Sequence, residues 1–153
     1  MSRHWIWPVS AKNWEILSRT RVWATYSRSA TRKVNPRDKV IFYVVGTGEL
    51  RNSYTIKNQW YENNELIWAE EKPKRAKIYP YQCNLKLHMQ GHAVYADLAS
   101  KLDFVENKLC PKVYVMGTHG GPANFQRPMS KKDFDHIIEA FRTIRHNEDA
   151  KSS

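Results

Sequence analysis

The sequence has few cysteines, no long apolar run and a shortage of acidic residues. Its two cysteines are too few for a disulfide framework, and Cys83 falls on the apolar side of an alternating segment, so we expect a buried free thiol there. No stretch of about 18 apolar residues is present, which argues against a membrane-spanning helix. No apolar segment follows Arg3 and His4, so a signal peptide is not expected either. These absences predict an intracellular protein without a membrane partner, cytoplasmic or, in a eukaryote, nuclear.

Motifs for nucleotide, metal and nucleophilic chemistry are also missing. The Gly-rich run 117–122 is not followed by Lys-Ser/Thr, so it does not predict a phosphate-binding loop. His88, His92 and the two distant cysteines do not supply the four clustered ligands of a zinc site. There is no GxSxG motif and no dense cluster of Asp, Glu and His. We expect no cofactor, no metal and no catalysis; the alternative is an enzyme whose site is assembled only by folding.

Basic residues are what the chain has in excess. Lys and Arg number 25 against 15 Asp and Glu, which gives a net charge of +10 and an isoelectric point near 9.7. A basic domain binds polyanions because each Lys or Arg near a phosphate releases condensed counterions. The composition therefore predicts nucleic acid as the partner. A basic surface that only aids solubility is the alternative.

Hydrophobic patterning predicts several strands with helices between them and at the ends. Expected strands lie at 4–9, 39–45, 51–61, 82–90 and 113–116, with a short apolar return at 66–68. Expected helices lie at 11–19 with Ser10 as N-cap, at 94–102, and after Ser130, where residues 134–144 have a helical period. Segments 24–35 and 70–77 are polar and basic, and Pro73 predicts that the second is irregular.

The clearest local pattern is at 82–90, where four apolar residues alternate with polar ones, as in a strand with one buried face. Regular βαβ alternation is absent. The predicted fold class is therefore α+β, with a mostly antiparallel, curved sheet or barrel. No linker divides the chain, so we expect a monomer with one domain over 1–147 and a disordered tail at 148–153.

Six tryptophans are the unusual feature of the composition. Trp5 and Trp14 are assigned to the core. Trp23 and Trp68 differ because each lies where a short apolar patch meets charged residues. Two facing indoles can hold a flat base between them, and stacking contributes about 1–3 kcal/mol per base. From composition alone, a core position for these two remains equally open.

Five segments in series resemble the EVE domain, a member of the PUA-like superfamily and a relative of the YTH domain. They are HWIWPVSAKNWEIL (4–17), RVWAT (21–25), VNPRDKVIFYV (34–44), YPYQCNLKL (79–87) and GPANFQRPMSKKDFDHI (121–137). The resemblance covers nearly the whole chain. It implies a PUA-like, bent, mixed or antiparallel β-barrel of about five to six strands with flanking helices. It also implies a pocket for an extruded, often modified base of DNA or RNA.

The resemblance assigns residues to that pocket. RVWAT resembles the YTH segment that supplies the first tryptophan around N6-methyladenine, here Trp23, with backbone groups of Ala24 and Thr25 at the base edge. The segment ending in ELIW resembles the one that supplies the second wall, here Trp68. The other expected pocket residues are Asn13, Ser10, Asn124 and Gln126.

Basic residues around these segments are expected to contact phosphates. They are Arg28, Arg32, Lys33, Lys72, Lys74, Arg75, Lys77 and Arg127. Flipping a base costs a few kcal/mol, and least in single strands or opened pairs, so we expect single-stranded or locally opened nucleic acid.

The chain departs from the family pattern at two positions. Arg37 stands in the turn before KVIFY, and Ser53 leads SYTIK, where the family usually has Gly. Ser53 either narrows the pocket or only accommodates the bend of the barrel.

The leading hypothesis is a nucleic-acid-binding reader of a flipped, modified and specifically methylated base. One alternative is a PUA-like nuclease or hydrolase acting on nucleic acid or nucleotides. The other is a general RNA-binding accessory protein without pocket chemistry.

Overall fold

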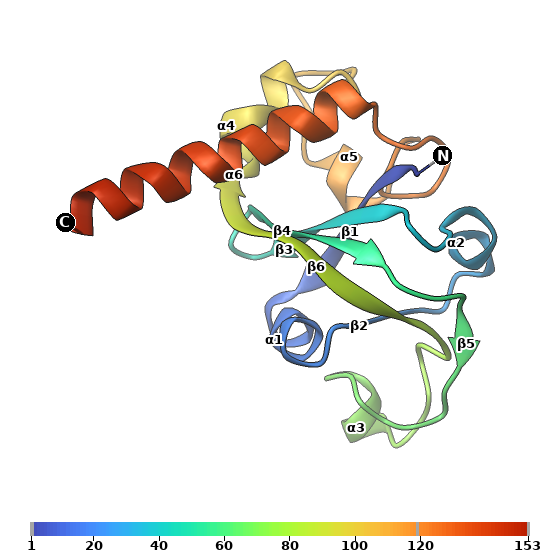
Figure 1. Ribbon diagram of the computed structural model, residues 1–153. Helices are drawn as coiled ribbons and strands as arrows, with labels where there is room; N and C mark the ends of the chain where they lie inside the picture. The colour runs from blue at the N-terminus through green and yellow to red at the C-terminus, as the bar shows by residue number, and fades with distance from the viewer. Residues whose placement is uncertain (1, 119, 153) are drawn as a thin grey trace.

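A curled mixed sheet forms the centre of the computed structural model, which describes residues 2–118 and 120–152 (Figure 1). Its strands are β1 (His4–Ser10), β2 (Val22–Thr25), β3 (Lys39–Val45), β4 (Glu49–Ile56), β5 (Tyr61–Glu62) and β6 (Tyr81–Val94). Their order is β1-β3-β4-β6-β2, with β5 also on β6. The β1–β3 pair is parallel and the others are antiparallel. This half-barrel with flanking helices confirms the predicted α+β, PUA-like fold.

The long strand β6 is what curls the sheet. Its C-terminal part pairs with β4 and its N-terminal part with β2 and β5, so this one 14-residue strand connects β4 to β2 and β5. The β4–β6 register shifts on both sides of Ser53. Asn52, beside it, has a φ of 54°. Such bulges bend a strand and increase its twist.

Helices flank the sheet and connect its strands. They are α1 (Ala11–Thr20), α2 (Arg28–Lys33), α3 (Glu71–Lys74), α4 (Tyr95–Leu98) with a 3-10 turn (Ala99–Lys101), α5 (Val113–Met116) and α6 (Lys131–Ser152). Ser10 caps α1 as predicted, because its Oγ accepts from Asn13 N at 3.2 Å. Helix α6 lies across one face of the half-barrel, while α1 and α3 lie on the opposite side (Figure 1). No helix of the described residues is long and apolar enough to cross a bilayer.

Alternation along the strands separates two hydrophobic cores. Successive side chains point to opposite faces of a sheet. Ile6 of β1 and Ile41 of β3 therefore pack with α6, whereas Trp5 and Phe42 pack with Trp23 and the other cluster. Cys83 is fully buried in the second cluster, and burial raises the pKa of its thiol, as expected for an inert free cysteine.

Several predicted elements were wrong. Residues 113–116 form helix α5, not a strand: the helical turn buries Tyr114 and Val115 and ends at Gly117 with a φ of 80°. Segment 24–35 contains α2 because Ser27 Oγ caps it through Ala30 N. Strand β4 ends at residue 56, short of the predicted 61.

Two C-terminal and loop expectations also need correction. Segment 70–77 contains the short helix α3, in which Pro73 is tolerated because the first turn needs no internal N–H donor. The predicted disordered tail is helical as far as Ser152, since α6 continues past the amphipathic stretch. Ser130 Oγ caps α6 by accepting from Asp133 N, and the Asp133 carboxylate accepts from the backbone N–H of Asp103 and Phe104.

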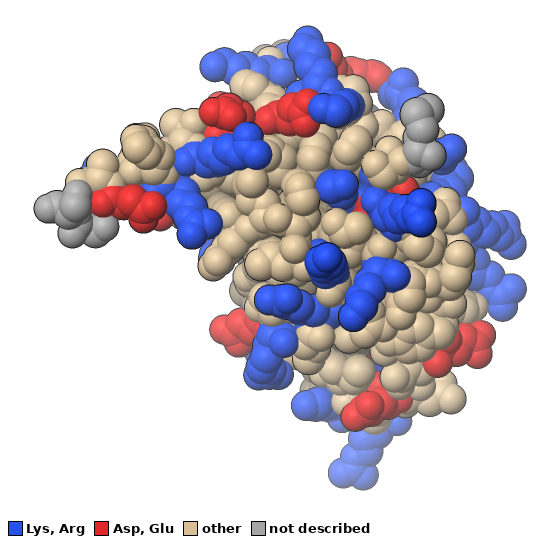
Figure 2. All heavy atoms as spheres, viewed as in Figure 1, with Lys and Arg blue, Asp and Glu red and all other residues tan. Residues whose placement is uncertain are grey.

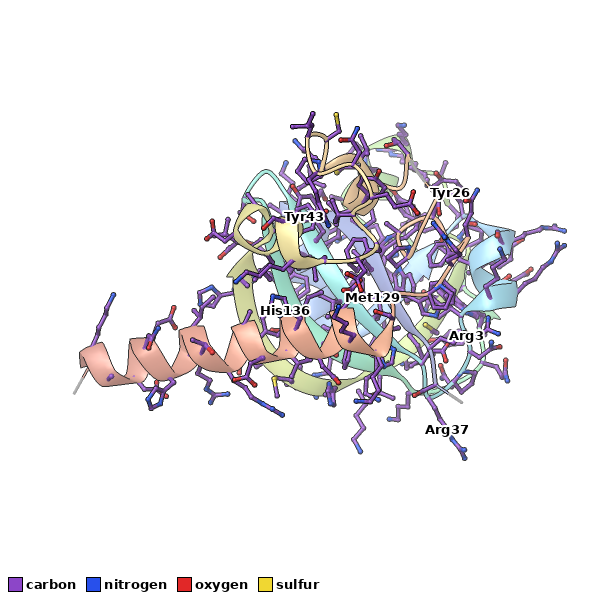
Figure 3. The ribbon with its side chains drawn as sticks, turned by 90° about the horizontal axis from the view of Figure 1, so that it is seen from above. Arg3, Tyr26, Arg37, Tyr43, Met129 and His136 are labelled. Atoms are coloured by element: carbon purple, nitrogen blue, oxygen red, sulfur yellow. The ribbon has the colours of Figure 1, made fainter. Side chains whose placement is uncertain are left out.

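The turn at 35–38 contains Arg37, which stands where the family usually has glycine. Arg37 has a φ of 79°, in the region that favours glycine, and its side chain points away from the body of the molecule (Figure 3). Asp38, at the end of the turn, is buried. Its carboxylate accepts from the Trp5 indole N–H and from the backbone N–H of Arg3 and Asn35. These contacts hold the turn in place, although glycine would suit the backbone conformation at position 37 better than arginine does.

Candidate functional site

A cavity of about 140 Å³ opens between the end of β1, helix α1, strand β2 and the loop around α3. We call it the aromatic cavity. It is lined by Trp7, Pro8, Val9, Ser10, Asn13, Leu17, Trp23, Ala24, Tyr26, Trp68, Glu70 and Tyr79. Ligand pockets for drug-sized molecules are commonly about 300–1,000 Å³, so this volume suits a single flat ring system.

Trp23 forms a wall that is built into the sheet. Its backbone pairs with Cys83 of β6, and its side chain is 1% exposed. The indole packs at a centroid distance of 5.8 Å from Trp7 and 5.1 Å from Trp60. These contacts hold one face of the cavity rigidly in place.

Trp68 forms a wall that belongs to a loop. The loop is held by the fully buried carboxylate of Glu71, to which Trp68 N donates at 3.1 Å and Tyr79 N at 3.0 Å. Ile67 N and Ile78 N donate to the same carboxylate, and the Lys77 ammonium lies 3.3 Å from it. Both ends of the loop are therefore tied to one side chain.

The contacts of this anchor lower the pKa of Glu71. Burial alone would raise that pKa, but the N–H groups of Tyr79, Ile78 and Trp68 and the Lys77 ammonium hold it below its ordinary value. Hydrogen bonds to a carboxylate favour its ionised form. The anchor is therefore an ionised group in the folded protein at neutral pH.

Asn13 joins α1 to the same loop. Its Nδ2 donates to the two carboxylate oxygens of Glu70 at 2.9 and 2.8 Å, and its Oδ1 accepts from Ala69 N at 2.9 Å. These bonds fix the orientation of the amide. Asn13 lines the cavity, but part of its hydrogen-bonding capacity is already used inside the protein.

Glu70 is the one charged side chain that lines the aromatic cavity among the described residues. Its charge reaches the neighbouring phenol: burial raises the pKa of Tyr79 above its ordinary value, and the carboxylate of Glu70 adds to that rise. Glu70 could not be selected from the sequence, because it lies in a run of charged residues that is typical of a solvated surface.

The two wall tryptophans differ from the buried Trp5 and the half-buried Trp60 in their hydrogen bonding. Trp5 Nε1 donates to Asp38, and Trp60 Nε1 donates to Val34 O. The buried Nε1 atoms of Trp23 and Trp68 have no hydrogen-bond partner among the described residues. Buried donors are normally satisfied, so unpaired ones on the walls of a cavity indicate a site rather than ordinary core.

A second hollow of about 290 Å³ continues from the aromatic cavity, because both are lined by Trp7, Pro8 and Tyr26. Tyr26 is 66% exposed and is labelled in Figure 3, on the side away from the C-terminal end of α6. Asn124 lines this second hollow, and its Oδ1 accepts from Gly121 N and Gln126 N. Asn124, an expected pocket residue, is thus placed beside the aromatic cavity rather than within it.

Other predicted pocket residues lie elsewhere. Thr25 is buried and does not line the cavity; its Oγ1 accepts from Ser27 N. Gln126 is exposed and lines neither hollow. Ser53 does not narrow the cavity, because its hydroxyl lies 3.1 Å from Nδ1 of His88 and away from the lining residues.

The predicted phosphate contacts fall into two groups. Most are exposed cations on α2 and at α3, the elements that follow the two wall segments; they are Arg28, Arg32, Lys72, Lys74 and Arg75, with Lys33 half-buried. Figure 2 shows Lys and Arg spread over the face seen in Figure 1. Lys77 and Arg127 are instead paired within the protein, with Glu71 and Glu106.

A larger and more open hollow lies on the α6 side of the sheet. His4 and Lys39 line it, next to Trp5 and Val40, whose side chains point to the opposite face. Its further lining cations are Arg3, Lys131 and Arg142, with the acidic residues Asp135 and Glu139 among them. The rings of His4 and His88 in this hollow stack on Phe134, and the hollow shares no lining residue with the aromatic cavity.

The described residues contain no group of three or more His, Cys, Asp and Glu side chains that could hold a metal ion.

The fold is that of solved YTH domains. The Pho92 YTH domain in complex with m6A matches with a TM-score of 0.63 at 16% identity, over 92% of this chain and 83% of that one. The YTH domain of Zygosaccharomyces rouxii MRB1 in complex with N6-methyladenosine RNA gives 0.59 at 11%, over 92% and 86%. The Mmi1 YTH domain in complex with RNA gives 0.64 at 13%, over 96% and 82%.

The sequence itself matches the EVE domain over residues 3–140. The chain therefore belongs to the EVE domain family, as the five segments predicted. Comparison with curated proteins gives no match.

Proposed function

We propose that this protein binds nucleic acid and holds one flipped, methylated base in the aromatic cavity. The observation that carries this proposal is the cavity itself: Trp23 and Trp68, which come from separate parts of the chain, line one ring-sized space with unpaired indole N–H groups. Stacking between aromatic walls favours a flat base, and an added methyl group increases the apolar contact. The solved neighbours in complex with m6A or RNA share the fold and support the same class of ligand.

Affinity in this proposal comes from the basic surface, and selectivity comes from the cavity. The exposed cations on α2 and α3 contact phosphates without reading sequence. A base that is already unpaired enters at the least free-energy cost, so single-stranded or locally opened sites bind best. Tyr26, exposed at the mouth, is placed to stack on a neighbouring base.

Replacing a wall residue tests the assignment. Trp68→Ala and Trp23→Ala should each remove about 1–3 kcal/mol of stacking and abolish discrimination between a methylated and a plain base. Binding of short oligonucleotides is measured by fluorescence anisotropy at one salt concentration, because backbone affinity varies steeply with salt. Trp14→Ala is the matched control: it removes an indole that packs on Phe42 and Tyr54 and does not line the cavity.

The proposal expects each wall variant to lose discrimination while its salt dependence stays that of the wild type. Thermal melting of each variant establishes that it is folded. If folded Trp23→Ala and Trp68→Ala variants still discriminate as the wild type does, the base does not enter this cavity.

Binding without catalysis is part of the same proposal. Glu70 is the one acidic side chain among the lining residues, and it is hydrogen-bonded to an amide rather than to a second acid or a base. General acid–base hydrolysis would require a positioned partner for it. Incubation with labelled RNA and DNA, with and without divalent metal, tests this point. If the labelled nucleic acid is cleaved and substitution of one His or acidic residue abolishes the cleavage, the protein is a nuclease rather than a reader.

A further inference from the structure

The aromatic cavity carries a charge of the opposite sign to the rest of the molecule. The chain has a net charge of +10, yet the one charged side chain among the lining residues is the carboxylate of Glu70. The cations that follow the walls lie on the exposed side of α2 and α3 and do not line the cavity. A phosphate backbone and the base that it carries therefore meet surfaces of opposite charge.

The remaining lining groups reinforce this preference. Trp7, Trp23, Tyr26, Trp68 and Tyr79 surround the space with aromatic rings. The face of an aromatic ring attracts a cation, and the attraction grows when the cation is desolvated. An aromatic wall with a carboxylate beside it is the arrangement that binds a positively charged, flat or methylated group most tightly.

Glu70 is free to accept further hydrogen bonds although it is already engaged. Asn13 Nδ2 lies at 2.9 and 2.8 Å from its two oxygens. An ionised carboxylate has about four lone-pair positions, so acceptor sites remain on this group. The amide also holds the carboxylate in place, which spares a ligand the free-energy cost of ordering it.

We propose that the cavity prefers a base that carries a positive charge through methylation of a ring nitrogen, and that Glu70 selects for that charge. This inference rests on the function proposed above. In N1-methyladenine and N3-methylcytosine, the exocyclic N–H lies next to the charged ring nitrogen. The carboxylate accepts a hydrogen bond from that N–H and stabilises the adjacent charge, while Trp23 and Trp68 stack on the ring. The neutral isomers N6-methyladenine and C5-methylcytosine offer the same heavy atoms without the additional proton and its charge.

The test compares these isomers in pairs. Short single-stranded RNA and DNA oligonucleotides carry one central N1-methyladenine or N6-methyladenine, and a second pair carries N3-methylcytosine or C5-methylcytosine. Dissociation constants are measured by anisotropy with the full chain, at neutral pH and one salt concentration. We expect the charged isomer of each pair to bind about tenfold more tightly.

Glu70→Gln tests the selecting residue. Glutamine keeps the size and one acceptor oxygen for Asn13 but removes the charge, so the ratio between charged and neutral isomers should fall to about one. Glu62→Gln removes the same charge from an exposed position outside the cavity and should keep the wild-type ratio. Quenching of tryptophan fluorescence by the free methylated nucleosides gives a second measurement that does not involve the phosphate backbone.

The outcomes separate this inference from the function on which it rests. If the neutral isomers bind as tightly as the charged ones, or if Glu70→Gln retains the preference, charge selection is refuted. The reader function still stands in that case, provided that Trp23→Ala abolishes discrimination between methylated and plain bases. If Trp23→Ala leaves that discrimination unchanged, both proposals fail.

Discussion

Glu71→Gln tests how the Trp68 wall is held. The substitution places an amide NH₂ where one carboxylate oxygen stood, and each of those oxygens accepts from two backbone N–H groups: Ile67 and Trp68 on one, Ile78 and Tyr79 on the other. At least two backbone N–H groups then face the NH₂ donor instead of an acceptor, and the Lys77 ammonium loses its counter-charge.

The size of the effect follows from those contacts. A hydrogen bond to a charged acceptor contributes about 1.5–3 kcal/mol, against about 0.5–1.5 kcal/mol for a neutral one, and unpaired buried groups add about 1–3 kcal/mol each. The loss is limited because the loop can open locally and regain water. We therefore expect local opening to become about 3 kcal/mol easier, which corresponds to a roughly 100-fold larger open population.

Amide hydrogen exchange measures this opening directly. The Trp68 and Tyr79 amides should exchange about 100-fold faster in Glu71→Gln, whereas amides of the β3–β4 pair should change little. Glu65→Gln lies in the same loop with an exposed side chain and serves as the control. Discrimination between methylated and plain bases should weaken in parallel. Equal exchange rates in the two variants would show that Glu71 does not anchor the wall.

Three further outcomes are expected. Arg37→Gly relieves a φ of 79° and should raise the free energy of unfolding by about 0.5–1 kcal/mol in urea denaturation; a lower value would contradict the strain argument. Because the pKa of Glu71 is lowered from 4.5, its contribution to stability is full above that pH and is lost as pH falls through the folded-state pKa; a Glu71→Gln variant with the same acid profile as the wild type would disprove this. In Gly91→Ala the new Cβ would lie 2.6 Å from atoms of Phe141 on α6, so the substitution should lower the free energy of unfolding by about 1–3 kcal/mol. An unchanged melting curve would show that α6 shifts to make room for the methyl group.

The fold was largely predictable because its signals are local. The β-rich run at 39–45 and the alternation at 82–90 each correspond to an observed strand. The segment 113–116 failed because Val and Tyr favour strands only where a partner strand exists, and a sequence does not show that partner. The short helices α2 and α3 were missed for the opposite reason: a cap or a tertiary contact stabilises them more than any periodic pattern does.

The site was predictable only where a family motif marks it. Trp23, Trp68, Ala24, Asn13 and Ser10 were selected by resemblance, and all line the cavity. Glu70 is held at the same cavity by the side-chain amide of Asn13, which is 57 residues away in sequence, and no local pattern reveals such a contact.

Burial changed the interpretation of other residues. Lys77 counts as a surface cation in the sequence, but its side chain is 12% exposed and paired with a buried acid. Tyr26 lies outside the five family segments, and Tyr79 begins one of them without being assigned to the pocket; only the folded chain brings both to the cavity.

The two walls of the cavity differ in how independently they can vary. Trp23 shares its contacts with the sheet and the central core, so a change there alters the stability of the entire domain. The Trp68 wall belongs to the loop around α3, which is held by the Glu71 carboxylate and by Asn13 of α1 rather than by strand register. Substitutions in this loop can therefore change which ligand is bound while the barrel stays the same.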